Sequence, residues 1–348
     1  MKISVCMIVK DEEEVLARCL DGVSRFADEI VIVDTGSTDR TVDIARQYTP
    51  NVFFFAWKDD FAVARNFSVS KTTGEYCMWL DADDTIEEIE AEKILRLKET
   101  TSPADTYMFL YRSGDIVYYR ERLMKRDERL IFQGRVHEAV SPFGRVEYTD
   151  ITVRHGKKPQ AYSTRNLDIY RKMQAEGETF SPRDEFYFGR ELYYHREFSS
   201  AEKRLRAVAE NKDAWVENRL SALSCLAECY LAQGEREKAK QTLLQSLLLS
   251  SPRAEILSRL AFLYTEEENW AQAAFWYKAC LNCRKEPQNG GFCAEDCYGY
   301  IPLMQLCLCS SRLGDDAAAE KYNLLAGKIK PDDPAYRYNL AYFASLKK

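Results

Sequence analysis

The chain lacks the features that bind proteins to nucleic acid or anchor them in a bilayer. Its 49 Lys and Arg residues are outnumbered by 55 Asp and Glu residues, which gives a net charge of -6, whereas phosphate backbones attract clustered positive charge. No apolar run approaches the roughly 20 residues of a membrane span. The opening apolar stretch, residues 3–9, meets acidic residues too early for a secretory signal. We therefore expect a cytoplasmic protein with no transmembrane segment and no nucleic-acid partner.

Glycine-rich phosphate loops are also missing. No G-x-G-x-x-G or G-x-x-x-x-G-K-[ST] motif follows a predicted strand, which argues against a dehydrogenase or a P-loop enzyme. Histidine is scarce, with 3 residues in 348. His195 lies in the helical half without a carboxylate or cysteine at a useful spacing, so we expect it to be structural.

Disulfides are not expected, although the chain has 11 cysteines. The count is odd, and Cys6, Cys19 and Cys77 stand alone in apolar patterns, which favours buried, reduced thiols. Four further cysteines lie closer together: Cys280, Cys283, Cys293 and Cys297. Their spacing allows a structural zinc site, but the first two occupy positions where a helical repeat needs small packing residues. Packing is the favoured interpretation, and zinc stays open.

The first hundred residues alternate apolar strands with helical patterns. Strands are predicted within residues 3–9, 29–34, 51–57 and 75–81, an arrangement typical of a mainly parallel sheet covered by helices. Beyond about Thr106 the β-rich stretches are shorter and predict a mixed or antiparallel extension of the sheet, with one strand at RLIFQGRV, residues 129–136. We therefore predict a Rossmann-like α/β domain over residues 1–160.

The second half is almost wholly helical and repeats itself. Leu226-Ala227, Tyr230 and Ala239 recur 34 residues later as Leu260-Ala261, Tyr264 and Ala273. Small residues at this period, with an aromatic residue between them, resemble the tetratricopeptide repeat (TPR), in which each unit is a pair of antiparallel helices. The predicted organisation is a linker and connecting helix at 161–182, then TPR-like repeats and a C-terminal capping helix at 183–348.

Candidate ligand-binding residues follow the predicted strands, because ligands of open α/β sheets bind at the carboxyl ends of the strands. Val9 and Glu12 follow the first strand, and Asp34 and Gly36 follow the second. Backbone groups and carboxylates there can meet a nucleobase or ribose, although both stretches also fit ordinary helix caps and turns. Arg65, on a helix that otherwise packs apolar residues, suits a diphosphate or base, with a surface ion pair as the alternative.

Three carboxylates follow the fourth strand within four residues. Asp81, Asp83 and Asp84 come directly after the apolar run that ends at Leu80. Like charges so crowded are unfavourable unless a cation lies among them. Alternate Asp81 and Asp83 can serve the ribose and a divalent ion, for which Mg²⁺ or Mn²⁺ is the natural choice.

In order and approximate spacing, SVCMIVKDEE, IVIVDTGSTD, FAVARNFSV and MWLDADD resemble family 2 glycosyltransferases of the GT-A fold, over residues 3–84. The resemblance implies that Asp34, Arg65 and Asp81 contact the nucleotide and that Asp83 binds the metal on the diphosphate. It also implies transfer of a sugar with inversion from a nucleotide diphosphate sugar, which we expect to be a UDP-sugar.

The Glu-Asp base motif usual in that family is not recognisable here. Residues 134–138, GRVHE, resemble a bacterial subset that includes lipopolysaccharide-core glucosyltransferases and peptide S-glycosyltransferases, the latter also with helical repeats. The resemblance implies that Glu138 is the base and that His137 orients it or the phosphates, with a surface ion pair as the alternative. It also suggests that His155 completes the metal shell, with a hydrogen-bonded core histidine equally open.

The leading prediction is a hexosyltransferase that acts on a peptide or protein side chain held partly by the repeats, which can also support a homodimer. A peptide acceptor is favoured because repeat concavities commonly hold extended peptides. One alternative is an interaction scaffold whose nucleotide-binding domain is inactive. The other is a glycosyltransferase acting on lipopolysaccharide or another glycan.

Overall fold

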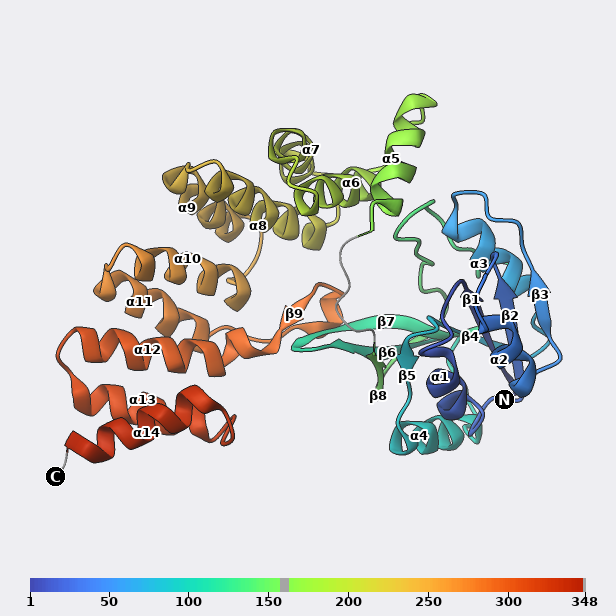
Figure 1. The fold of residues 1–348 in the computed structure, drawn as a ribbon, viewed down its shortest axis with the longest axis horizontal. Helices are drawn as coiled ribbons and strands as arrows, with labels where there is room; N and C mark the ends of the chain where they lie inside the picture. The colour runs from blue at the N-terminus through green and yellow to red at the C-terminus, as the bar shows by residue number, and fades with distance from the viewer. Residues whose placement is uncertain (157–162, 347–348) are drawn as a thin grey trace. The chain divides into compact units, whose positions relative to one another are not determined.

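The computed structural model describes residues 1–156 and 163–346 and divides into two compact units (Figure 1). The first unit comprises Met1–Thr179 with Gln288–Gly290, and the second comprises Phe180–Pro287 with Gly291–Lys348. The main division falls inside the stretch 161–182 that the sequence predicts to connect two domains. Residues 157–162, which include the first two residues of that stretch, lie outside the described residues.

A mixed sheet forms the centre of the N-terminal unit. Eight strands lie in the order β3-β2-β1-β4-β7-β6-β8-β5. The first four in this order are parallel, β7 is antiparallel to both β4 and β6, and β8 is parallel to β6. The strands are β1 (Ile3–Val9), β2 (Glu29–Asp34), β3 (Val52–Phe54), β4 (Tyr76–Leu80), β5 (Asp84–Thr85), β6 (Thr106–Ser113), β7 (Ile116–Lys125) and β8 (Val146–His155).

Helices cover both faces of this sheet, which explains why β1, β2 and β4 are continuous apolar runs. One apolar core contains buried residues of α1, α2 and α4, and the other contains Ala62 of α3. Asp60 begins α3 because its side chain accepts a hydrogen bond from the Val63 N–H at 2.9 Å. The helices are α1 (Leu16–Val23), α2 (Thr41–Tyr48), α3 (Phe61–Ser70), α4 (Glu88–Lys98) and α5 (Arg165–Ala175).

The strand predicted at residues 129–136 is wrong. This stretch forms only an isolated bridge between Gln133 and Ala139. The Asn66 side chain takes the place of a neighbouring strand, because it accepts from the Phe132 N–H at 2.8 Å and donates to the Phe132 carbonyl at 2.9 Å. Gly134 then turns the chain with a φ of 96°. This apolar stretch has the sequence pattern of a strand. Its backbone is hydrogen-bonded by one side chain, however, and lacks the ladder of hydrogen bonds to a neighbouring strand.

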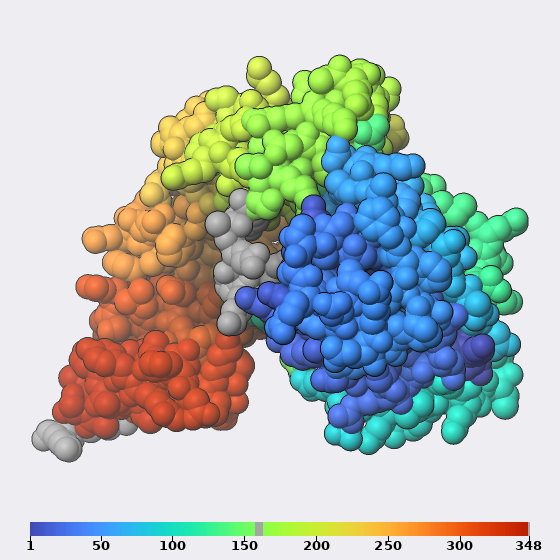
Figure 2. All heavy atoms as spheres, turned by 45° about the vertical axis from the view of Figure 1, so that its right-hand side comes forward, coloured from blue at the N-terminus to red at the C-terminus, as the bar shows by residue number. Residues whose placement is uncertain are grey.

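Helices make up most of the C-terminal unit, and consecutive helices lie side by side in chain order (Figure 1). In the space-filling view the colour of this unit accordingly changes from green through yellow to red (Figure 2). A short 3₁₀ turn follows α9, and the segment between α11 and α12 holds two further turns and the two-residue strand β9 (Cys293–Ala294). The helices are α6 (Pro182–Tyr194), α7 (Phe198–Glu210), α8 (Val216–Ala232), α9 (Arg236–Gln245), α10 (Ala254–Glu266), α11 (Trp270–Leu281), α12 (Tyr300–Arg312), α13 (Asp316–Gly327) and α14 (Pro334–Leu346).

Small repeated residues allow these helices to pack closely. Ala227 and Ala261 on α8 and α10, and Ala239 and Ala273 on α9 and α11, are all 0% exposed. Their positions repeat every 34 residues, so each helix pair meets its neighbour in the same way. The predicted fold class, an α/β domain followed by TPR-like helices, is confirmed. None of the described helices is both long enough and apolar enough to cross a membrane.

Candidate active site

Hydrogen bonds join the loops that follow β1 and β2. The Val9 carbonyl accepts from the Thr35 N–H at 3.0 Å and from the Thr35 hydroxyl at 3.1 Å. The Glu12 N–H donates to Thr41 Oγ1 at 2.7 Å. The Val9 side chain is buried and Glu12 is partly exposed. Both residues therefore lie at the carboxyl edge of the sheet, with Glu12 presenting the more accessible side chain.

Asp34 holds the turn that follows β2. Its carboxylate accepts from the Gly36 N–H and the Ser37 N–H, each at 3.1 Å. Gly36 has a φ of 108°, which disfavours any residue with a Cβ. The residues that follow β2 thus form the turn that the sequence allowed as one interpretation. It does not exclude ligand binding, because a carboxylate has about four acceptor positions and the two N–H groups occupy only part of them.

Arg65 joins two carboxylates that are distant in sequence. From α3, its Nε donates to Glu138 Oε1 at 2.8 Å, its Nη2 pairs with Asp81 Oδ1, and its Nη1 donates to the Leu80 carbonyl at 3.2 Å. The guanidinium also lies 4.7 Å from the centroid of the Trp79 ring. Arg65 is buried, so the surface ion pair considered from the sequence is wrong. The structure instead brings Arg65, Asp81 and Glu138 into one cluster.

The charges of this cluster stabilise one another. Burial lowers the pKa of Arg65, but the negative charges of Asp81 and Glu138 outweigh this effect and raise the pKa overall. Desolvation raises the pKa of Asp81, yet the Arg65 and Arg122 guanidinium groups hold that pKa well below its usual range. Arg65 and Asp81 therefore stay ionised at neutral pH.

The loop that carries His137 and Glu138 has an unusual backbone. Gly134 and His137 have φ values of 96° and 51°, and a non-glycine residue in this region stores about 1–3 kcal/mol of strain. Arg135 anchors the loop through an ion pair with Glu178, beyond the end of α5. The loop thus holds Glu138 against Arg65 in a fixed position. Such strain is often found at functional sites.

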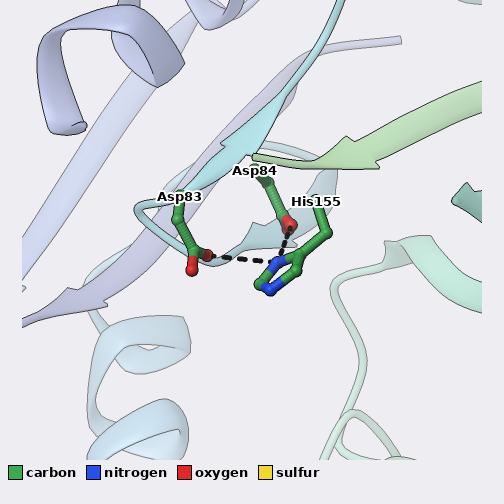
Figure 3. Close-up of side chains that lie close together, drawn as sticks. All are labelled: Asp83, Asp84 and His155. Atoms are coloured by element: carbon green, nitrogen blue, oxygen red, sulfur yellow. Dashed lines mark ion pairs between the residues drawn. The ribbon is translucent and has the colours of Figure 1, made fainter. Parts of the chain in front are cut away.

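A second cluster lies beside the first, where β5 pairs with β8. Asp83, Asp84 and His155 each offer a ligand atom within 4.8 Å of the other two. Figure 3 shows both carboxylates directed at the imidazole, with His155 Nδ1 lying 3.5 Å from Asp83 Oδ1 and 3.8 Å from Asp84 Oδ1. The register of β5 and β8 sets Asp84 opposite His155. Residues 71 positions apart are thereby brought together.

The donor atoms of this cluster suit a divalent cation. Carboxylate oxygen is a preferred ligand of Mg²⁺ and Mn²⁺, and imidazole is accepted by the softer transition metals. The hydrogen-bonding contact with Asp84 raises the pKa of His155 against the effect of burial, and the charge of Asp83 raises it further. The same negative charges would attract a metal ion, which would have to take the place of a proton on the ring.

Sequence reasoning missed two residues of this region. Arg122 on β7 is fully buried and pairs with Asp84 at 3.2 Å. The Tyr111 hydroxyl on β6 lies 2.9 Å from Asp84 Oδ1 and 3.0 Å from His155 Nδ1. The one available signal was the charged triplet R-E-R inside the apolar strand IVYYRERLM. A cation in a strand that is buried on both faces needs a countercharge nearby.

Other candidate ligands form no comparable cluster. Among residues 1–156 and 163–346, only Asp83, Asp84 and His155 form a group of three or more histidine, cysteine or carboxylate ligands at metal-binding distances. Cys280 is buried in α11 with its thiol 3.6 Å from the Ala254 carbonyl, which agrees with a packing role. The His195 ring nitrogen Nδ1 lies 2.9 Å from the Glu191 carbonyl, as expected of a structural histidine.

The fold and the site together define a class. A mixed α/β sheet with carboxylates at the carboxyl ends of its parallel strands has the arrangement in which doubly wound domains bind their ligands. Residues 4–151 match the family described as glycosyl transferase family 2. The N-terminal domain is therefore a family 2 glycosyltransferase domain, followed by TPR-like repeats.

Three curated relatives share parts of the chain. A TPR repeat-containing protein of Synechococcus elongatus is 36% identical over 40% of this chain and 35% of its own length. The SPbeta prophage-derived glycosyltransferase SunS of Bacillus subtilis is 28% identical over 54% and 48%. The lipopolysaccharide core biosynthesis glycosyltransferase LpsC of Rhizobium meliloti is 29% identical over 42% and 59%. The chain thus spans only about a third to three fifths of the length of these relatives.

Proposed function

We propose that the protein transfers a sugar, with inversion and with the help of a divalent metal ion, from a nucleotide diphosphate sugar to an acceptor. One observation carries the proposal: Arg65 joins Asp81 and Glu138 immediately beside Asp83 and His155. Two adjacent clusters thereby supply groups for nucleotide binding, for metal binding and for proton removal. The family of the N-terminal domain supports the same assignment.

The donor nucleotide occupies the carboxyl ends of β1, β2 and β4. Asp34 has acceptor capacity for a base that carries a ring N–H, as uracil, thymine and guanine do, and among these the donor that we propose is a UDP-sugar. Glu12 and Asp81 are partly exposed carboxylates that suit the hydroxyls of the ribose. The backbones of Val9 and Gly36 line the nucleotide-binding position. Arg65 fixes Asp81 and is charged, so it also attracts the diphosphate.

Asp83 and His155 hold the metal, either Mn²⁺ or Mg²⁺. When bound, the ion neutralises the charge that develops on the leaving nucleotide diphosphate. Asp83 contributes a carboxylate that is 9% exposed, and His155 a side chain that is 33% exposed. Both side chains are therefore shielded from bulk water yet reachable by a ligand.

Glu138 removes the proton from the acceptor nucleophile. Its ion pair with Arg65 orients the carboxylate, and a general base must be held within reach of the proton that it removes. If Arg65 turns towards the diphosphate when the donor binds, the carboxylate is released to accept that proton. His137, next to Glu138 and in a strained conformation, orients the base or the phosphates.

A peptide or protein side chain, held partly by the repeats, is the acceptor that we favour. Stacked helix pairs present extended surfaces that suit a peptide chain. A lipopolysaccharide or other glycan is the second candidate acceptor, because the relative LpsC of Rhizobium meliloti is a lipopolysaccharide core biosynthesis glycosyltransferase. Both acceptors use the same donor site, so the donor is tested first.

The test is a calorimetric screen of the purified chain against nucleotide diphosphates and nucleotide sugars, each with Mn²⁺, with Mg²⁺ and with chelator. We expect one nucleotide sugar to bind only in the presence of metal and to raise the thermal midpoint. Mass spectrometry then follows transfer of that sugar to a peptide library and to a core oligosaccharide. No binding across the panel would contradict the proposal and favour an interaction scaffold with an inactive nucleotide-binding domain.

A further inference from the structure

Four side chains from four strands form a buried network behind the Asp83–His155 pair. Arg122 of β7 pairs with Asp84 Oδ2 at 3.2 Å and donates from Nη1 to the Trp79 carbonyl at 3.1 Å. Asp84 Oδ1 lies 2.9 Å from the Tyr111 hydroxyl, which in turn lies 3.0 Å from His155 Nδ1. The network is therefore continuous from Arg122 to His155.

Asp84 has its acceptor positions largely used within the protein. Oδ2 accepts from the Asp81 N–H at 3.1 Å as well as pairing with Arg122, and Oδ1 accepts from Tyr111. The side chain is also 0% exposed. Moving this carboxylate onto a metal ion would take it from the buried guanidinium, which is strongly unfavourable. Asp84 therefore acts as an anchor, although its distances alone would permit it to be a ligand.

The positions of the protons follow from counting donors. Tyr111 has one hydroxyl proton, and both oxygens of Asp84 face donors, Oδ2 towards Arg122 and the Asp81 N–H and Oδ1 towards Tyr111, so this proton is donated to Asp84. The Tyr111 oxygen can then only accept from His155 Nδ1. The other two groups near Nδ1, Asp83 Oδ1 and Asp84 Oδ1, are also acceptors, at 3.5 and 3.8 Å. Three acceptors around one ring nitrogen require that this nitrogen carries a proton.

We infer that Tyr111 is a positioning residue that fixes His155 as the tautomer with its proton on Nδ1, which would leave Nε2 as the nitrogen able to hold a metal ion. Imidazole offers its lone pair only from the unprotonated nitrogen, so the choice of tautomer decides which atom can coordinate. The inference deepens the proposed function, on which its metal-binding part rests. Its tautomer part concerns the metal-free protein alone.

The first measurement is nitrogen-15 NMR of the imidazole side chains at a pH where they are neutral. The chain has only 3 histidines, and a His155→Gln variant identifies the His155 signals. We expect the wild-type protein to carry the His155 proton on Nδ1. In Tyr111→Phe, which keeps the ring but removes the hydroxyl, we expect a shift towards the other tautomer. A wild-type protein with the proton on Nε2 overturns the inference.

The second measurement is Mn²⁺ binding, followed by calorimetry and electron paramagnetic resonance, without donor or acceptor. Loss of a group that orients a metal-binding histidine weakens affinity about 10–100-fold, and we expect this loss in Tyr111→Phe. Tyr119→Phe is the matched control, since Tyr119 lies on β7 opposite Leu110 and its ring packs on Tyr148 instead. It should bind Mn²⁺ as the wild type does.

The results of these two measurements distinguish the positioning role of Tyr111 from the proposed function. Equal Mn²⁺ affinity in the wild type and in Tyr111→Phe overturns the positioning role and leaves the proposed function intact. A wild-type protein that binds no Mn²⁺ contradicts the metal-binding part of both, while the tautomer still reports on the network. A spectrum that matches the wild type in its remaining signals shows that Tyr111→Phe is folded.

Discussion

Two regions at the end of β4 neutralise their negative charge in different ways. Asp81 and Asp84 are each paired with a buried arginine, Arg65 and Arg122 respectively. Asp83, between them, faces the His155 ring instead. Three carboxylates can lie within four residues because each has a different cationic or protonatable neighbour. Because Asp84 is also paired with a buried arginine, we expect Asp83 to be the carboxylate that takes part in holding an exchangeable cation.

The two arginine pairs differ in turn. Arg122 and Asp84 have side chains that are 1% and 0% exposed, whereas Asp81, the partner of Arg65, has a side chain that is 38% exposed. A pair sealed from solvent can only stabilise and orient its surroundings. A pair that is open on one side can also exchange partners when a ligand arrives. We therefore expect the Arg122 pair to matter for stability and the Arg65 pair for binding.

The largest effect is expected from Asp83→Ala, which removes the carboxylate of the metal region. Nucleotide diphosphate affinity measured by calorimetry with Mn²⁺ should fall to the level found with chelator, while the thermal midpoint stays near that of the wild type. Asp43→Ala, which removes an exposed carboxylate on α2, is the control and should bind normally. Unchanged affinity in Asp83→Ala would rule out this metal assignment.

Glu138→Gln tests the base without changing the size of the side chain. Removal of a general base typically lowers turnover by about 10²–10⁴-fold. Donor affinity should change far less, because the amide oxygen can still accept from Arg65. The measurement is steady-state transfer together with calorimetric binding of the donor, and the exposed Glu128→Gln is the control. Full turnover in Glu138→Gln would show that another group is the base.

The variants Arg122→Met and Arg65→Met compare the buried Arg122–Asp84 pair with the partly exposed Arg65–Asp81 pair. Loss of one partner of a buried ion pair destabilises a protein by about 3–5 kcal/mol, and Asp84 is then left without its guanidinium. Arg65→Met should cost less stability, because Asp81 can turn to solvent and Glu138, at 11% exposed, is less deeply buried than Asp84. Urea unfolding of both variants checks the order. If Arg65→Met proves the less stable variant, the distinction between a sealed and an open pair is wrong.

The smallest effect concerns the pH dependence of stability. The folded pKa of Asp81 is lowered, so this group stabilises the fold above its unfolded pKa of about 3.9, and the contribution is lost as pH falls through the folded pKa. Asp81→Asn should therefore be less stable than the wild type at neutral pH, and the difference should shrink under acidic conditions. Urea unfolding at several pH values measures this gap, with Asp43→Asn as the control. A gap that does not change with pH would contradict the assignment.

Much of the fold was predictable because its signals are local. Apolar runs marked β1, β2 and β4, and the 34-residue period marked the helical repeats. The predicted strand at residues 129–136 failed because the Asn66 side chain, 66 residues from its backbone partner, replaces the missing ladder. The pattern of apolar residues in a sequence indicates which side chains are buried, but it does not indicate which groups hydrogen-bond to the backbone.

The sequence by itself determined which chemical groups follow each parallel strand. Asp34, Asp81 and Asp83 had to gather at one edge, since parallel strands in a doubly wound sheet end on the same side. Their roles as nucleotide and metal ligands stay predictions.

Only the tertiary structure decided which groups are neighbours across the chain. The pairing of Arg65 with Glu138 joins residues 73 positions apart, and Tyr111 meets His155 over 44 positions. These contacts depend on the register of β6 with β8, which pair in parallel, and on a loop with positive φ values, neither of which has a local sequence signal. The physical reason is that the charge of a side chain follows from the identity of one residue, whereas the residue with which it pairs depends on the path of the whole chain.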